Sequence, residues 1–273
     1  MCVAISAVMS LLQAPPQSDV RVLAGLPEDV MTRVTMSDGD VVYGVRNDGV
    51  WQLVARPITS DGTGVPQVLV TAPAGLVLMS PALAPDGRLY FESNVRTPAI
   101  GGRDDSDVWA IERSARGWGK SSAIGAPFAS EYNEHSPTVD AHGTICFNST
   151  RPRGLGRNDI YCGMLTSRDE PRLIASVSSA SQDASPWLSA DGNVLLFASN
   201  RPNGAGGWDI YMSRKVSGEW ADPRNLGSPI NTAGDETWVT LSTSGDKLLF
   251  NRIEPGAARG QVHVTASAAT LGR

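Results

Sequence analysis

The chain has 273 residues, of which 41% are hydrophobic and 19% charged, and its formal net charge is −5. This length can bury a core, either as one large domain or as two small ones. The acidic balance and the lack of any Lys/Arg run exclude a nucleic-acid surface and an anionic-membrane surface.

Residues 1–17, MCVAISAVMSLLQAPPQ, contain a short apolar stretch. It is too short to span a bilayer and lacks the basic start of a signal peptide. We interpret it as a poor or truncated export signal, or a disordered N-terminus, and assign residues 18–273 to one folded domain. No other apolar run has the length of a transmembrane helix, so we expect no transmembrane segment.

The rest of the chain is built from an internal repeat. The copies are VTMSDGDVVYGVR (34–46), SPALAPDGRLYFESNVR (80–96), SPTVDAHGTICFNSTR (136–151), SPWLSADGNVLLFASNR (185–201) and ETWVTLSTSGDKLLFNR (236–252). Three copies continue into a further run, DVWAI (107–111), DIYCG (159–163) or DIYMS (209–213). The turn glycines supply the positive φ that short hairpins need, and the runs are apolar on both faces. Four strands in about 50 residues are typical of a β-propeller blade, so we predict an all-β chain.

The pattern SP-x-L-x-x-DG-x-x-L-x-F-x-S-x-R … DIY resembles the WD40-like repeat of TolB-type β-propellers, over about residues 34–267. This resemblance implies a single β-propeller domain, usually in a bacterial periplasmic or secreted protein. It does not imply one activity.

We predict blades at approximately 34–79, 80–135, 136–184, 185–235 and 236–268. The last copy lacks an outer strand, which residues 20–25 could supply, closing five four-stranded blades without a free edge. In the alternative, residues 269–272 provide that strand and the N-terminus starts a sixth blade. We favour five.

Arginine and aspartate recur at the two ends of one loop in three copies. Each arginine could lock its loop by bonding the aspartate, or it could capture an anion. We favour the structural role, because the pairs recur from copy to copy; the last copy has Arg252 but Gln261 in place of the aspartate. The predicted pairs are Arg96 with Asp107, Arg151 with Asp159, and Arg201 with Asp209.

Three acidic residues, Glu134, Asp183 and Glu236, each precede a turn glycine by nine positions. The shared offset predicts that they gather at one mouth of the central channel. We expect either that backbone N–H groups cap them locally, which we favour, or that a cationic or hydroxyl-rich ligand binds there. In the second case His135, Trp187 and Trp238 lie nearby. The tryptophans could stack on a sugar or peptide, although packing in the core is the favoured role.

Cys146 and Cys162 lie in runs that a hairpin would make neighbours. They would form a disulfide in an exported protein, but we favour two packed thiols. No zinc-type spacing, dinucleotide loop or nucleophile motif occurs, so we expect no metal, no cofactor and no catalytic residue.

We therefore predict a non-catalytic binding or scaffold propeller, periplasmic or secreted and monomeric. Its ligand would be a protein or carbohydrate held at a channel mouth. The alternative is a glycoside hydrolase or lyase that uses the axial carboxylates. A third possibility is a purely structural domain of a larger assembly.

Overall fold

The computed structural model describes residues 20–23, 26, 30, 32–36, 39–57, 64–95, 105–114, 117–257, 261–267 and 271. Within these ranges the chain forms strands and no α-helix, which confirms the all-β prediction. None of the described residues belongs to a helix long and apolar enough to cross a membrane.

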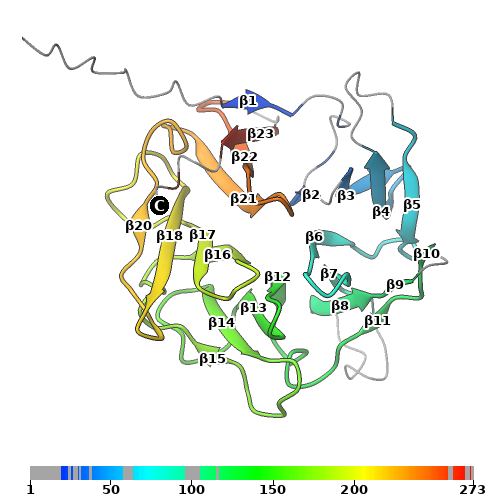
Figure 1. The fold of residues 1–273 in the computed structure, drawn as a ribbon, viewed down its shortest axis with the longest axis horizontal. Coiled ribbons are helices and arrows are strands. Elements are labelled where there is room, and N and C mark those ends of the chain that lie inside the picture. The colour runs from blue at the N-terminus through cyan, green and yellow to red at the C-terminus, as the bar shows by residue number, and fades with distance from the viewer. Residues whose placement is uncertain are drawn as a thin grey trace, which may run out of the picture.

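The strands form antiparallel sheets arranged around a central axis, with β2, β6, β12, β16 and β21 innermost (Figure 1). The first sheet contains β2 (Thr35–Met36), β3 (Asp40–Asn47), β4 (Val50–Pro57) and β5 (Gln67–Thr71). The second contains β6 (Met79–Leu83), β7 (Leu89–Ser93), β8 (Asp107–Ile111) and β11 (Ser122–Ala123), beside a ribbon of β9 (Arg113–Ser114) and β10 (Gly117–Trp118). The third contains β12 (Glu134–Val139), β13 (Thr144–Ser149), β14 (Asp159–Met164) and β15 (Arg172–Leu173).

The fourth sheet contains β16 (Asp183–Leu188), β17 (Val194–Ser199), β18 (Asp209–Val216) and β20 (Arg224–Asn225), with β19 (Glu219–Trp220) paired to the end of β18. The last contains β21 (Asp235–Leu241), β22 (Lys247–Ile253), β23 (Gln261–Ser267) and β1 (Arg21–Val22).

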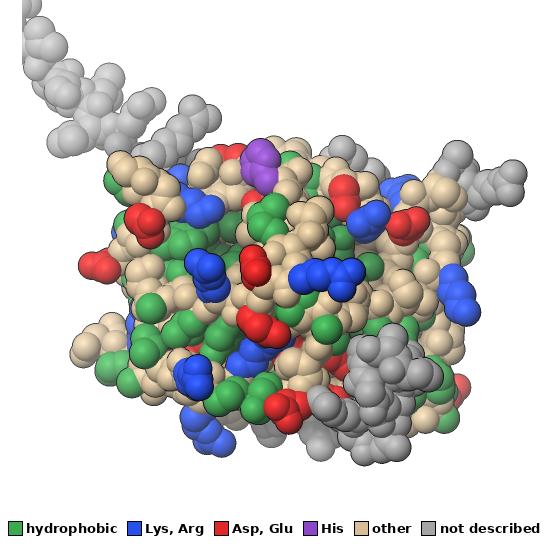
Figure 2. Space-filling model, turned by 90° about the horizontal axis from the view of Figure 1, so that it is seen from below, with side chains coloured by type: hydrophobic (Ala, Val, Ile, Leu, Met, Phe, Trp, Pro, Cys, Tyr) green, Lys and Arg blue, Asp and Glu red, His purple; other side chains and the backbone are tan. Residues whose placement is uncertain are grey.

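The cores lie between neighbouring sheets, because each sheet buries both of its faces. Phe197 of β17 and Ile160 of β14 share one core cluster, and Ile210 of β18 shares another with Phe250 of β22. This explains why the second strand of each repeat contains consecutive apolar residues, such as Leu195–Phe197 in β17. The outer surface mixes acidic and basic side chains (Figure 2).

The N-terminal strand closes the last sheet. Residues Arg21 and Val22 of β1 pair antiparallel with Thr265 and Val264 of β23. This pairing is the one predicted for closure by residues 20–25, and it covers the edge that β23 would otherwise expose. The number of blades itself stays a prediction.

Four innermost strands bend at a residue in the left-handed region. The recurring Ser-Pro dipeptide supplies it in three sheets, where φ is 52° at Ser80, 53° at Ser136 and 54° at Ser185. Trp238 takes this position in β21, with φ 49°. The pairing of each strand with its neighbour shifts register there, as in a β-bulge. The Ser-Pro motif therefore marks a bulge that faces the axis.

Arg33 crosses the axis at the level of these bulges. It stands six residues before Gly39, where the Ser-Pro copies have proline. Its side chain is fully buried and donates to the carbonyl oxygens of Pro137, at 3.0 Å, and Pro186, at 2.7 Å. Burial lowers the pKa of Arg33 to about 10, against the opposing effect of the Glu92 charge. One side chain thus ties the first inner strand to the third and fourth.

Cys146 of β13 and Cys162 of β14 face each other directly in the pairing and form a disulfide, with their Cα atoms 4.1 Å apart. The preference for two packed thiols was therefore wrong. The hairpin does make the two residues neighbours, as expected.

Deleting residues 1–26 should lower the melting temperature and promote aggregation, because it removes β1 and exposes β23. Deleting only residues 1–17 keeps β1 and is the matched control. The measurement is thermal unfolding with light scattering. An unchanged melting curve for the longer deletion would contradict closure by β1.

Candidate functional site: the axial pocket

The three acidic residues of the repeat are locked inside the fold. Glu134 is fully buried and accepts hydrogen bonds from the Ser130 backbone N–H, at 3.0 Å, and hydroxyl, at 2.6 Å. Arg151 Nε donates to the same carboxylate at 3.2 Å. Burial raises the pKa of Glu134, while these partners oppose the rise. The same arrangement recurs for Asp183 with Ser179 and Arg201, and for Glu236 with Thr232 and Arg252.

These contacts correct the predicted arginine–aspartate pairs. Arg151 and Arg201 bind the acidic residue that begins the inner strand, and neither pairs with Asp159 or Asp209. Arg201 Nη2 lies 2.6 Å from Asp183 and also donates to the Val177 carbonyl at 2.7 Å. Arg252 makes the same ion pair with Glu236, so the missing aspartate does not leave it free. Arg96 lies outside the described residues, so its pairing with Asp107 stays a prediction.

The aspartates of the DIY runs hold their own loops instead. Asp209 accepts the Ala205 N–H at 2.8 Å, and Asp159 accepts the Gly156 N–H at 3.0 Å. Glycine is required at Gly204, because a Cβ there would overlap the Asp209 carboxylate. The repeated Gly/Pro/Asn cluster is therefore a compact loop folded over an aspartate.

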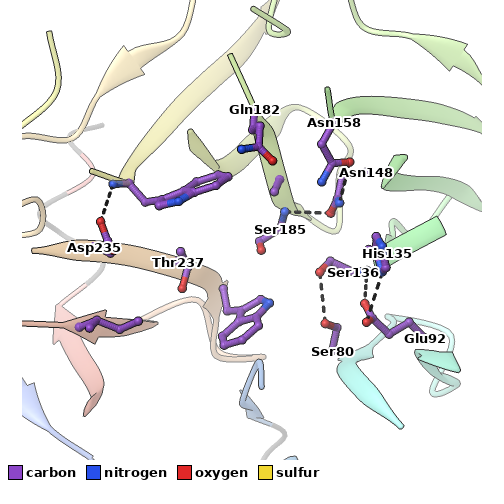
Figure 3. A pocket seen from close by; sticks show the side chains of 14 residues that line it. Ser80, Glu92, His135, Ser136, Asn148, Asn158, Gln182, Ser185, Asp235 and Thr237 are labelled. Atoms are coloured by element: carbon purple, nitrogen blue, oxygen red, sulfur yellow. Dashed lines mark hydrogen bonds and ion pairs between the residues drawn. The ribbon is translucent and has the colours of Figure 1, made fainter. Parts of the chain in front are cut away.

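A pocket of about 390 Å³ opens at the axis, at the end where the inner strands begin (Figure 3). Its walls combine tryptophan rings, side-chain amides, hydroxyl groups and two carboxylates. The residues are Ser80, Glu92, His135, Ser136, Asn148, Asn158, Gln182, Ala184, Ser185, Trp208, Asp235, Thr237, Trp238 and Ile253.

A carboxylate–imidazole pair forms one wall of this pocket. His135 Nδ1 lies 3.4 Å from Glu92 Oε1, and the Ser136 N–H donates to Glu92 Oε2 at 2.9 Å. Burial would raise the pKa of Glu92, but the His135 and Ser136 hydrogen bonds hold it below its usual value. Burial would lower the pKa of His135, but Glu92 raises it above the ordinary value. Glu92 therefore stabilises the protonated form of this imidazole, whose side chain is 31% exposed.

Of the six predicted ligand-binding residues, His135 and Trp238 line this pocket. Glu134, Asp183 and Glu236 do not, because each is fully buried with its arginine. Trp187 lines a separate cavity of about 140 Å³, past the bulges toward the hairpin turns, and packs on the core between the fourth and last sheets. The six residues therefore do not form one ligand site. Backbone N–H groups cap the three carboxylates, and Trp187 packs in the core, as in the alternatives that we favoured.

Sequence reasoning missed Glu92, Asp235 and Trp208. The repeat contains a signal for all three, because each departs from its copies, and Asp235 aligns with Asn133. Glu92 aligns with Asn148, and Trp208 aligns with Ser106 and Asn158 immediately before the DIY aspartate. The pocket thus combines the shared Ser-Pro serines with residues that differ between copies.

No group of three or more His, Cys, Asp or Glu side chains suited to a metal occurs among the described residues. The pocket offers hydrogen-bond donors and acceptors beside aromatic rings, which is the composition of a binding site for a polar ligand.

Comparison with known proteins supports the fold. No protein-family model matches the chain, and no curated protein sequence matches it. Among solved structures, TolB from Acinetobacter baumannii is 14% identical with a TM-score of 0.52, over 86% of this chain and 53% of that one. A putative TolB from Agrobacterium tumefaciens is 15% identical with a TM-score of 0.52, over 84% and 72%. Trypanosoma rangeli sialidase is 13% identical with a TM-score of 0.51, over 88% and 55%.

The chain thus has a TolB-like β-propeller fold, as the repeat implied. It spans about half the length of the Acinetobacter TolB. At these identities the similarity establishes the fold alone.

Asp183→Ala should lower the free energy of unfolding by roughly 3–5 kcal/mol, because Arg201 would stay buried without its partner. Asp209→Ala should cost less, about 1–3 kcal/mol, because it removes only the acceptor of the Ala205 N–H. Chemical denaturation of both variants measures which of them loses more free energy of unfolding. A larger loss for Asp209→Ala would restore the predicted Arg201–Asp209 pair.

Glu92→Gln should lower the pKa of His135, because the negative charge that raises it disappears while burial remains. NMR titration of the imidazole protons measures this change, and the exposed His142 serves as an internal reference. An unchanged His135 pKa would show that the two residues are not coupled in solution.

Proposed function

We propose that this chain is a non-catalytic binding propeller, and that its axial pocket recognises a glycan. Trp238 carries the proposal. It occupies the bulge position at which three other sheets have serine, and it holds a left-handed backbone that costs a bulky residue about 1–2 kcal/mol. Its half-exposed side chain lines the pocket. Strain retained at a pocket wall supports a role in binding.

The other walls suit a hydroxyl-rich ligand. Asn158 and Gln182 present half-exposed amides that can both donate and accept, and Thr237 adds a hydroxyl group. An aromatic ring beside such groups can stack on a sugar face while the amides bond its hydroxyls. A protein ligand is the other possibility that the fold allows.

The carboxylates on which the hydrolase alternative depended are not accessible to a substrate. Glu134, Asp183 and Glu236 are buried in ion pairs, outside the pocket. In the pocket, the pKa of Glu92 lies below its usual value, whereas a general acid needs a raised one.

The proposal includes export to the bacterial periplasm or beyond. The Cys146–Cys162 disulfide supports this location, because disulfides persist in oxidising compartments.

Trp238→Ser should abolish glycan binding without lowering stability, because serine is the residue at this bulge in three other sheets. The measurement is a glycan panel followed by calorimetric titration of the strongest ligand, with thermal unfolding in parallel. Trp187→Ala is the control, and it should reduce stability but leave binding intact. Equal binding by the protein and Trp238→Ser would contradict the proposed site. If no glycan of the panel binds, glycan recognition is contradicted and a protein is the expected ligand.

A further inference from the structure

The carboxylate of Asp235 is not paired with a basic side chain among the described residues. It lies ten residues before Gly245, and Asn133 lies ten residues before Gly143 in the third copy. Asn133 Oδ1 accepts the Ser106 N–H at 2.9 Å, and Asp235 Oδ1 accepts the Trp208 N–H at the same distance. An amide therefore performs the same capping in another blade, and the fold does not require a carboxylate here.

The second oxygen of Asp235 remains available to a ligand. Among the described residues, Oδ2 has no hydrogen bond and the carboxylate has no ion pair, unlike the neighbouring Glu236, which pairs with Arg252. Asp235 is half-buried and lies across the pocket from the Glu92–His135 pair (Figure 3). Of the two carboxylates in the pocket, Glu92 lies against the His135 imidazole, whereas Asp235 has no basic side chain bonded to it among the described residues.

The aromatic residues near this carboxylate suit the same chemistry. Trp208 donates its backbone N–H to Asp235, Trp238 follows Asp235 by three positions on β21, and both side chains line the pocket. A carboxylate with tryptophan faces attracts an organic cation through its charge and through cation–π contacts.

We infer that the axial pocket, which Trp208 and Trp238 also line, binds a primary ammonium group of its ligand at Asp235. This inference rests on the proposed function and narrows it to a glycan that contains an amino sugar. The sugar hydroxyls would then contact the amide wall of Asn158 and Gln182. A lysine side chain or a peptide N-terminus carries the same ammonium chemistry, so the experiment has to separate the two sources.

The test uses two matched pairs of probes and the full chain. One pair is a glucosamine tetramer and an N-acetylglucosamine tetramer, and the other is a short lysine peptide with free amines and its fully acetylated form. The glucosamine tetramer should bind about tenfold more tightly than its acetylated counterpart, as expected for one partly desolvated ion pair. Asp235→Asn should remove this preference and leave the melting temperature unchanged, because asparagine keeps the Trp208 cap. Asp222→Asn removes an exposed charge elsewhere and is the matched control.

Each outcome decides a different statement. A preference for the free amine in the sugar pair, lost in Asp235→Asn, supports the inference. The same preference in the peptide pair alone supports the ammonium site but overturns the glycan. Equal binding of free and acetylated probes, or a preference that survives in Asp235→Asn, overturns the inference and leaves the proposed function standing. If none of the four probes binds, the inference is also overturned.

Discussion

The left-handed residue near the start of four inner strands is the constraint on which the centre of this propeller depends. It places a bulge where the strands approach the axis, and in three of these strands its N–H donates to the preceding blade. Ser80 N–H donates to Thr32 Oγ1 at 2.6 Å, Ser136 to Glu92 at 2.9 Å and Ser185 to Asn148 at 3.0 Å. Each bond joins two neighbouring blades, so a local backbone choice sets the packing of the ring.

The same bulges orient the carbonyls that Arg33 uses. Because Pro137 and Pro186 turn their carbonyl oxygens to the axis, one guanidinium can satisfy both. Ser136 lines the pocket before these carbonyls, and Thr138 lines the smaller cavity after them. Arg33 lies between the two cavities along the inner strands. It therefore ties together inner strands that carry pocket residues, which is the kind of preorganisation that a binding site needs.

The repeated positions allowed the scaffold to be predicted from the sequence, but they did not show which residues line the pocket. The hairpin glycines, the apolar second strands and the closing role of residues 20–25 follow from positions that recur. The partner of Arg201 did not follow, because Asp209 is nearer in the sequence, whereas Asp183 is nearer in space, across the β16–β17 hairpin. Trp187 and Trp238 were grouped although they stand five and seven residues before their turn glycines. The bulge between these two offsets sends one ring to the core and the other to the pocket.

The central claim is that a ligand sits in the axial pocket above Arg33. A crystal structure of the chain with the tightest glycan from the panel tests this most directly. The account predicts a sugar ring on Trp238, an amine or hydroxyl group at Asp235, and Arg33 still bonded to Pro137 and Pro186. A ligand bound beside Trp187, or on the outer edge of a blade with the axial pocket empty, would contradict it.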